Sequence, residues 1–237
     1  MERGLPNPFD EDNVATSPER LDRMQSQWWS MLRPTGVSAE AGYAAFDDLA
    51  ARYEEQHRHY HTLEHIAEML RIVPRLTPTG IEMFPIQLAV WFHDAVYDTH
   101  SSTNEFDSSQ YALGVMRGLG LVEATTTEVA RLILSTDHRF HNFDDAPESY
   151  RILHDADLAI LGAAPERYDR YAADVRKEYA WVPEKQFRTG RARILQTFLE
   201  RPRIYLTEVM KVEGEAAARQ NLEREWKRLG EGDAPSC

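Results

Sequence analysis

Apolar residues recur every three or four positions along most of the chain, as in Leu21, Met24 and Trp28 and again in Val129 and Leu132. This spacing gathers apolar side chains on one face of a helix. No sustained alternation of apolar and polar residues indicates a strand, and the hairpin dipeptides Asn-Gly, Asp-Gly and Gly-Gly are absent. The pattern therefore predicts an all-α protein.

Several local signals predict where helices begin. Pro-Glu pairs at 18, 147, 165 and 183 suit a first helical turn, where proline costs no hydrogen bond and a carboxylate faces the positive end of the helix dipole. Ser102-x-x-Glu105 and Thr125-x-x-Glu128 predict capping boxes. With the apolar spacing, these signals predict helices over 18–32, 39–55, 62–76, 82–97, 103–118, 126–138, 147–161, 166–181, 184–200 and 214–229.

The helical pattern predicts one domain. Residues 1–16 are acidic and rich in proline and asparagine, so we expect a disordered or docked N-terminal tail. Residues 17–229 would form a single helical domain and 230–237 a flexible C-terminal tail. No internal repeat interrupts this organisation.

Charge and cysteine content narrow the function classes. The formal net charge is −12, from 39 acidic against 27 basic residues, and no run of Lys or Arg offsets it. Such a chain repels nucleic-acid polymers and anionic membrane surfaces. The single cysteine, Cys237, excludes a disulfide within the chain, and no segment approaches the roughly 18 apolar residues of a membrane span. We therefore expect a cytoplasmic protein; its oligomeric state stays open.

Candidate chemistry centres on His93-Asp94, which interrupts an apolar segment from Ile86 to Tyr97. A buried carboxylate is costly unless it is paired, neutralised or bound to a metal. Imidazole and carboxylate together suit a divalent cation. In the alternative interpretation His93 is a hydrogen-bonded core residue and Asp94 pairs with a basic side chain.

Three other stretches carry metal-ligand types. His61 and His65 are four residues apart, a spacing that would place both on one side of a helix. His138 follows an apolar helical segment. Asp155 and Asp157 lie two residues apart, and Asp157 is flanked by apolar residues that would turn it inward.

The order of these stretches resembles the HD superfamily of metal-dependent phosphohydrolases, in particular the predicted HD-type phosphohydrolases of bacteria. The three blocks are Tyr-His-Thr-Leu-Glu-His-Ile from residue 60, Trp-Phe-His-Asp-Ala-Val-Tyr-Asp from 91 and Asp-Ala-Asp-Leu-Ala-Ile-Leu-Gly from 155. The resemblance continues through Asn104-Glu105, Glu178-Tyr179 and Arg219 to Leu222, and so covers most of residues 50–226. It implies an HD-like helical bundle with additional N- and C-terminal helices.

The resemblance also implies a site. The family's metal ligands H, HD and D fall on His61, His93, Asp94 and Asp157, with Asp157 preferred to Asp155 because of its Ala-Asp-Leu context. This mixed shell suits Mn, Fe, Co, Ni or Zn and does not exclude Mg. Asp94, His65 and His138 are the candidate catalytic residues. His65 and His138 could also bind a second metal or the substrate's phosphate, or equally be histidines that hydrogen bond to the ligands. Candidate phosphate-binding residues are Arg58, Arg139 and Lys177, together with Arg131, Arg188 and Arg191.

The expected function is hydrolysis, by a metal-activated water, of a small phosphorylated molecule such as a nucleotide or related phosphoester. Two alternatives remain open at this point. One is a di-iron oxygenase with His65 or His138 as extra ligands. The other is a non-catalytic module that binds a metal or senses a ligand, since a fold alone does not choose among activities.

Overall fold

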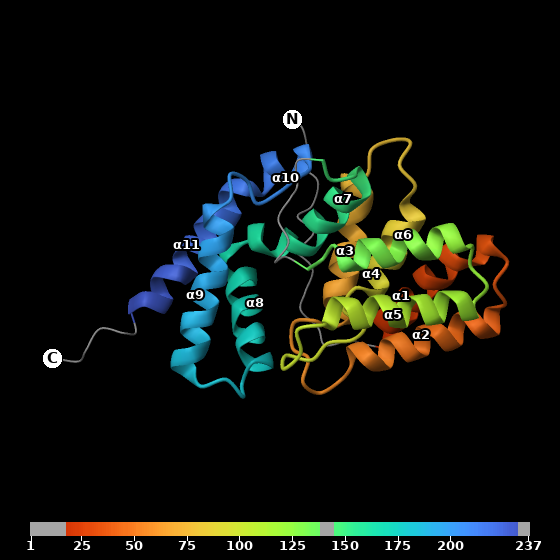
Figure 1. The fold of residues 1–237 in the computed structure, drawn as a ribbon, viewed down its shortest axis with the longest axis horizontal. Coiled ribbons are helices and arrows are strands. Elements are labelled where there is room, and N and C mark those ends of the chain that lie inside the picture. The colour runs from red at the N-terminus through yellow and green to blue at the C-terminus, as the bar shows by residue number, and fades with distance from the viewer. Residues whose placement is uncertain (1–17, 138–144, 232–237) are drawn as a thin grey trace.

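The structure, a computed structural model, describes residues 18–137 and 145–231, and within these ranges it contains helices and no strand (Figure 1). The all-α prediction is therefore confirmed. The α-helices are α1 (Pro18–Leu32), α2 (Ala39–Tyr53), α3 (Leu63–Leu76), α4 (Met83–Phe92), α5 (Asn104–Gly118), α6 (Glu123–Leu134), α7 (Glu148–Asp157), α8 (Pro165–Glu178), α9 (Glu184–Glu200), α10 (Glu208–Glu213) and α11 (Glu215–Glu231), with short 3-10 helices η1 (Arg33–Thr35) and η2 (Leu158–Gly162).

The Pro-Glu signals located helix starts correctly. Pro18 and Pro165 are the first residues of α1 and α8, and Pro147 and Pro183 immediately precede α7 and α9. Proline fits there because the first helical N–H groups have no partner within the helix.

The two predicted capping boxes were wrong. Helix α5 is preceded by Thr103 rather than Ser102, and α6 begins at Glu123, ahead of Thr125. For α6, the reason is the short α5–α6 connection, in which Gly120 has a left-handed φ of 72° and Leu121 N–H donates to the Met116 carbonyl. This C-terminal motif reverses the chain so tightly that α6 starts at once.

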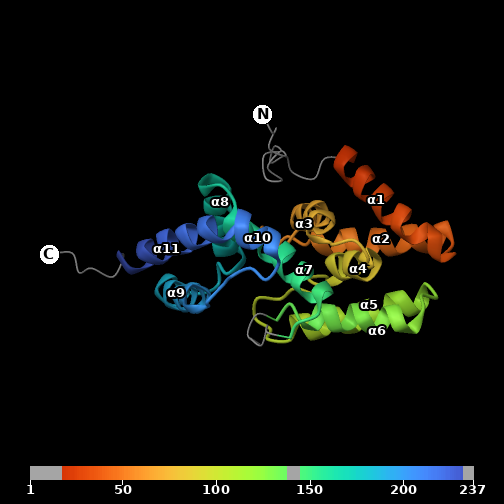
Figure 2. The same ribbon diagram turned by 90° about the horizontal axis from the view of Figure 1, so that it is seen from above.

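Helix α4 is at the centre of the N-terminal helices (Figures 1 and 2) and packs against α3, α5, α6 and α7. A helix that is apolar on all sides is expected to be buried, and Ile86 to Phe92 are buried except for Gln87. Trp91 is in edge contact with Trp28 of α1 and Phe46 of α2. The end of α4 therefore carries His93 into the interior.

Helix α4 ends earlier than expected. The sequence predicts a helix to Tyr97, whereas α4 stops at Phe92 and residues 93–96 form a turn. Arg58 explains the stop, since its guanidinium donates to the carbonyls of Asp94 at 2.7 Å and Ala95 at 3.2 Å. A cation at a helix C-terminus satisfies carbonyls that lack a helical partner.

The C-terminal helices α8, α9 and α11 lie together at the other end of the molecule, linked to α7 by η2 (Figures 1 and 2). One connected hydrophobic core nonetheless runs from Met24 in α1 to Leu222 in α11. No helix in the described ranges has the length and apolar character needed to cross a membrane.

Candidate metal centre

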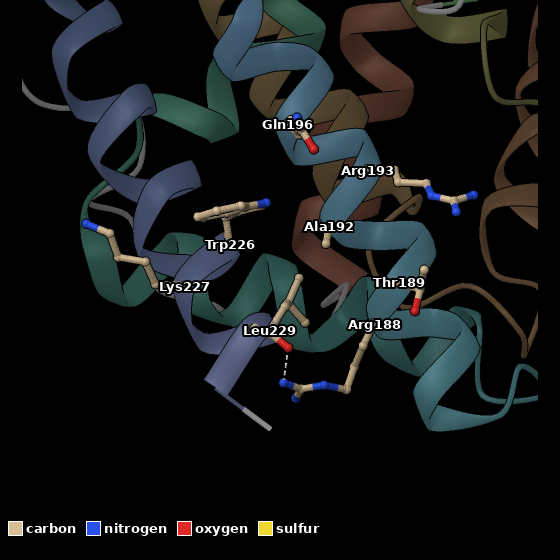
Figure 3. A pocket seen from close by; sticks show the side chains of 9 residues that line it. Arg188, Thr189, Ala192, Arg193, Gln196, Trp226, Lys227 and Leu229 are labelled. Atoms are coloured by element: carbon tan, nitrogen blue, oxygen red, sulfur yellow. Dashed lines mark hydrogen bonds between the residues drawn. The ribbon is translucent and has the colours of Figure 1, made fainter. Parts of the chain in front are cut away.

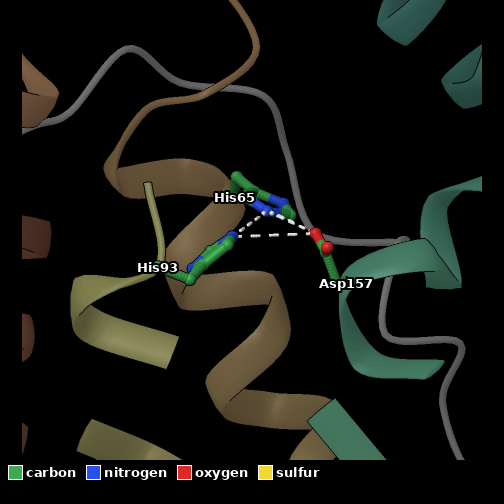
Figure 4. A group of neighbouring side chains, drawn as sticks. All are labelled: His65, His93 and Asp157. Carbon is green, nitrogen blue, oxygen red and sulfur yellow. Dashed lines mark hydrogen bonds and ion pairs between the residues drawn. The ribbon is translucent and has the colours of Figure 1, made fainter. Parts of the chain in front are cut away.

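Three segments far apart in the sequence meet at His65, His93 and Asp157 (Figure 4). His65 projects from α3, His93 directly follows α4, and Asp157 is the last residue of α7. His65 Nε2 lies 3.3 Å from His93 Nε2 and 3.2 Å from Asp157 Oδ1, and the last two atoms are 3.7 Å apart. Both histidines are 2% exposed, so water competes little for this space.

The two separations from His65 Nε2, 3.3 and 3.2 Å, fit a common cation, and the 3.7 Å between His93 Nε2 and Asp157 Oδ1 is slightly wider. Nitrogen and oxygen ligands about 2.1 Å from a metal, at angles between octahedral and tetrahedral, are separated by roughly 3.0 to 3.4 Å. Two neutral imidazole nitrogens that face each other have nothing to share unless a proton or a cation lies between them. The donor set therefore suits a divalent ion held by nitrogen and oxygen atoms.

His93 is fixed by the backbone of its own helix. Its Nδ1 lies 2.9 Å from the Val90 carbonyl, an acceptor, so Nδ1 carries the proton and Nε2 faces the cluster. Such a hydrogen bond sets the tautomer of metal-binding histidines. Burial lowers the pKa of His93, but Asp94 and Asp157 outweigh it and raise the pKa well above its ordinary value. The site therefore attracts positive charge.

Asp94 lies against the same imidazole. Its Oδ2 is 3.1 Å from His93 Nε2, although Asp94 is not part of the compact His65–His93–Asp157 group. Burial raises the pKa of Asp94, and the neighbouring His93 and His61 together bring it below its usual range. Asp94 is thus a charged carboxylate directly beside the group.

Asp155 and Asp157 have different environments despite their proximity in α7. The fully buried Asp155 carboxylate accepts the N–H of Leu206 at 2.8 Å, the N–H of Thr207 at 2.7 Å and the Thr207 hydroxyl at 2.7 Å. It holds the segment that starts α10, a short helix that the sequence did not predict. Asp157 alone of the pair faces the two histidines, as its sequence context indicated.

His61 lies just before α3, although its spacing from His65 predicted that the two would share one side of a helix. Helix α3 begins at Leu63 with Thr62 as N-cap, so His61 and His65 do not share one helical face. The group of three contains His65 and not His61. Instead, His61 Nδ1 lies 2.7 Å from Glu178 Oε2, and its ring centroid is 6.0 Å from that of His65.

Glu178 is a residue of this region that sequence reasoning did not select. It ends α8, is buried, and accepts hydrogen bonds from the loop before α3. Burial raises its pKa, but His61 and the N–H groups of His59 and His61 lower it to about 2. Burial lowers the pKa of His61, while Glu178, Asp94 and Asp157 raise it overall. The one signal for Glu178 in the sequence was that the resemblance to the HD superfamily extends through Glu178-Tyr179.

The predicted phosphate-binding residues are dispersed. Arg58 is buried and donates to Glu55 at 3.0 Å as well as to backbone carbonyls, so it secures the loop rather than facing a ligand. Lys177 is exposed and pairs with Asp174 at 2.7 Å. Arg191 pairs with Glu225, and Arg188 binds carbonyls at the end of α11. Arg131 is exposed on α6. His138 and Arg139 lie outside the described residues.

A hollow of about 540 Å³ lies between α9 and α11, away from the histidines (Figure 3). Trp226 and Ala192 face it, whereas Arg193 and Lys227 point away. None of the proposed metal ligands lines it. Because its basic side chains do not converge, the His65–His93–Asp157 group is the better candidate for chemistry.

No family model, curated protein or solved structure matches this chain. The structural support for the site therefore comes from its own geometry.

Proposed function

We propose that this protein is a metal-dependent phosphohydrolase that acts on a small phosphorylated molecule, a nucleotide or related phosphoester. The observation that carries the proposal is the convergence of His65, His93 and Asp157 from α3, α4 and α7 within 3.7 Å of one another. The resemblance of the three sequence blocks to HD-type phosphohydrolases supports it independently of that geometry.

His65, His93 and Asp157 are the proposed ligands, with Asp94 completing the set. His65 takes the imidazole position that the sequence assigned to His61, because its Nε2 faces His93 and Asp157 directly. A divalent ion held there supplies Lewis acidity toward a phosphoryl oxygen and toward water. The Val90 carbonyl keeps His93 Nε2 available, and Asp94 is a carboxylate that can accept a proton beside the site.

The overall charge favours a compact substrate. With a net charge of −12, most of the surface repels a polyanion. A small phosphoester presents its charge only to the buried group, where a cation would neutralise it. We also propose that the protein acts in the cytoplasm and has no nucleic-acid partner.

Metal content and turnover together test the function. Protein purified without chelators should contain metal, and with Mn²⁺ it should hydrolyse members of a phosphoester panel. Asp157→Ala should lose both properties, whereas Asp22→Ala, which alters an exposed carboxylate of α1, should keep both. Loaded protein that hydrolyses no phosphoester would overturn the assignment, and so would turnover that survives complete removal of metal.

A further inference from the structure

We propose that His61, held by Glu178, donates a proton to the leaving oxygen of the substrate. This inference rests on the hydrolytic function proposed above and assigns it a catalytic residue distinct from the metal ligands. It differs from the role that the sequence gave His61, which was to bind the metal.

Glu178 is an anchor with every oxygen engaged. Its Oε1 accepts the backbone N–H groups of His59, Tyr60 and His61 at 2.8, 2.8 and 3.0 Å. Its Oε2 accepts from His61 Nδ1 at 2.7 Å and from the Tyr97 hydroxyl at 2.9 Å. The carboxylate is fully buried, so breaking one of these hydrogen bonds leaves a charge poorly compensated. The loop, the ring and the end of α8 are therefore fixed together.

This anchor decides which nitrogen of His61 is available. An ionised carboxylate only accepts hydrogen bonds, so Nδ1 must carry a proton and Nε2 is the second, outward nitrogen. Among the described residues none hydrogen bonds to Nε2, and it is not among the buried polar atoms that lack a partner. Nε2 is thus a position open to a ligand or to water.

Two aromatic contacts also fix the orientation of the His61 ring. Tyr97 stacks on it with centroids 4.3 Å apart, and Tyr60 meets it edge-on at 5.0 Å. A proton donor has to be held in a narrow range of orientations toward the reacting atom. Two aromatic contacts and one carboxylate supply that restraint before any substrate binds.

His61 is adjacent to the proposed metal site without being part of it. Its ring centroid lies 6.0 Å from that of His65, and its nitrogens fall outside the group that shares one small space. A phosphoester bound at His65, His93 and Asp157 would therefore lie next to His61.

The proposed step is balanced without another reactant. Water forms a new bond from its oxygen to phosphorus, while the bond from phosphorus to the leaving oxygen breaks and that oxygen takes the electron pair. His61 acts as an imidazolium, in which Glu178 holds the Nδ1 proton and the second proton, on Nε2, moves to the leaving oxygen, so an alcohol departs. The attacking water gives its proton to Asp94, the carboxylate beside the group, and solvent then takes that proton and restores the one lost by His61.

Leaving-group dependence tests this role. A p-nitrophenyl phosphoester has a stable leaving anion and little need for a proton, whereas an alkyl phosphoester needs one. His61→Asn should lower kcat for the alkyl ester by roughly a hundred- to ten-thousandfold. It should change kcat for the aryl ester by less than about tenfold, because general-acid assistance contributes little there. Metal per chain should equal that of wild type.

Glu178 acts through His61 as a positioning residue, and the metal-free protein gives a readout that does not depend on turnover. In ¹⁵N NMR spectra, His61 of the wild type should be protonated at Nδ1, and Glu178→Gln should shift that signal. Tyr97→Phe is the matched control, since it removes one hydrogen bond to Oε2 and leaves His61 paired. Because Glu178→Gln removes a buried charge on which folding depends, His61→Gln provides a second test of the leaving-group effect.

The outcomes separate the two proposals. Equal losses on both esters, together with lost metal, would show that His61 is a ligand and would overturn the proton-donor role. An unchanged alkyl-ester rate in His61→Asn would overturn it as well. If the wild-type protein hydrolyses neither ester while fully loaded with metal, the hydrolytic function itself fails.

Discussion

Two buried polar clusters, one among the C-terminal helices and one where α3, α4 and α7 meet, differ in how their polar groups are matched. In the Arg191 cluster, formed by Arg191, Glu225 and Tyr168, the guanidinium donates to both Glu225 oxygens at 2.8 and 3.0 Å and the Tyr168 hydroxyl donates to the same carboxylate. Each charge there meets its opposite. In the His65–His93–Asp157 group, two imidazole nitrogens and a carboxylate point at one another.

The contrast separates a structural charge pair from a site. A bidentate Arg–carboxylate pair satisfies its own donors and acceptors and needs nothing else. Facing imidazole nitrogens are complete only when a proton or cation joins them. Burial and ionisable residues are common to both clusters, so what distinguishes the candidate metal centre is the convergence of two imidazole nitrogens and a carboxylate oxygen on one small space.

The largest expected effect comes from breaking the ion pair in the Arg191 cluster. Arg191→Met leaves Glu225 buried without its cation, which should lower the free energy of unfolding by about 3 to 5 kcal/mol. Urea denaturation measures this, with Arg193→Met on the exposed side of α9 as the control. A loss below about 1 kcal/mol would show that the pair is no better than a surface ion pair.

Acid should weaken the Glu178 anchor. Its folded pKa of about 2 lies below the ordinary 4.5, so its stabilisation is complete above pH 4.5 and is lost as the pH falls toward 2. The difference amounts to roughly 3 kcal/mol. Urea unfolding from pH 5 to 2 should show a steeper decline for wild type than for Glu178→Gln; parallel curves would contradict the anchor.

A bound metal should stabilise the folded protein only through the His65–His93–Asp157 group. A divalent ion at a hundred times its dissociation constant should raise the free energy of unfolding by about 2.7 kcal/mol, and a chelator should reverse the change. Arg191→Met should keep this increment because its cluster is separate, whereas Asp157→Ala should lose it. Thermal or urea unfolding with and without Mn²⁺ measures both, and an increment in Asp157→Ala would place the ion elsewhere.

The smallest expected effect concerns Asp155, the carboxylate of α7 that lies outside the His65–His93–Asp157 group. Thr207→Ala removes a hydrogen bond to Asp155 and the side-chain cap on Met210 N–H, at a cost of about 1 kcal/mol. Thr197→Ala, on an exposed position of α9, is the control. Metal binding should be unchanged, and a loss of metal would mean that Asp155 contributes to the site.

Local signals in the sequence located most of the helices. Apolar spacing and Pro-Glu pairs act within a few residues, so α1, α7, α8 and α9 begin at or within a residue of where they were predicted. The end of α4 depended instead on Arg58, thirty-six residues from Asp94 in the chain. Helix α10 likewise depended on Asp155, a residue of α7. Neither contact leaves a local pattern.

The sequence by itself determined the all-α class and brought His93, Asp94 and Asp157 forward, because apolar neighbours make a carboxylate or imidazole stand out. Only the tertiary structure decided which of His61 and His65 lies against His93 and Asp157. The spacing of four residues allows either histidine to take that place. The outcome follows from where α3 begins and from the hydrogen bond between His61 and Glu178, which lies at the end of α8, 117 residues from His61. Hydrogen bonds across such separations are set by packing of whole helices, which periodicity along the chain does not encode.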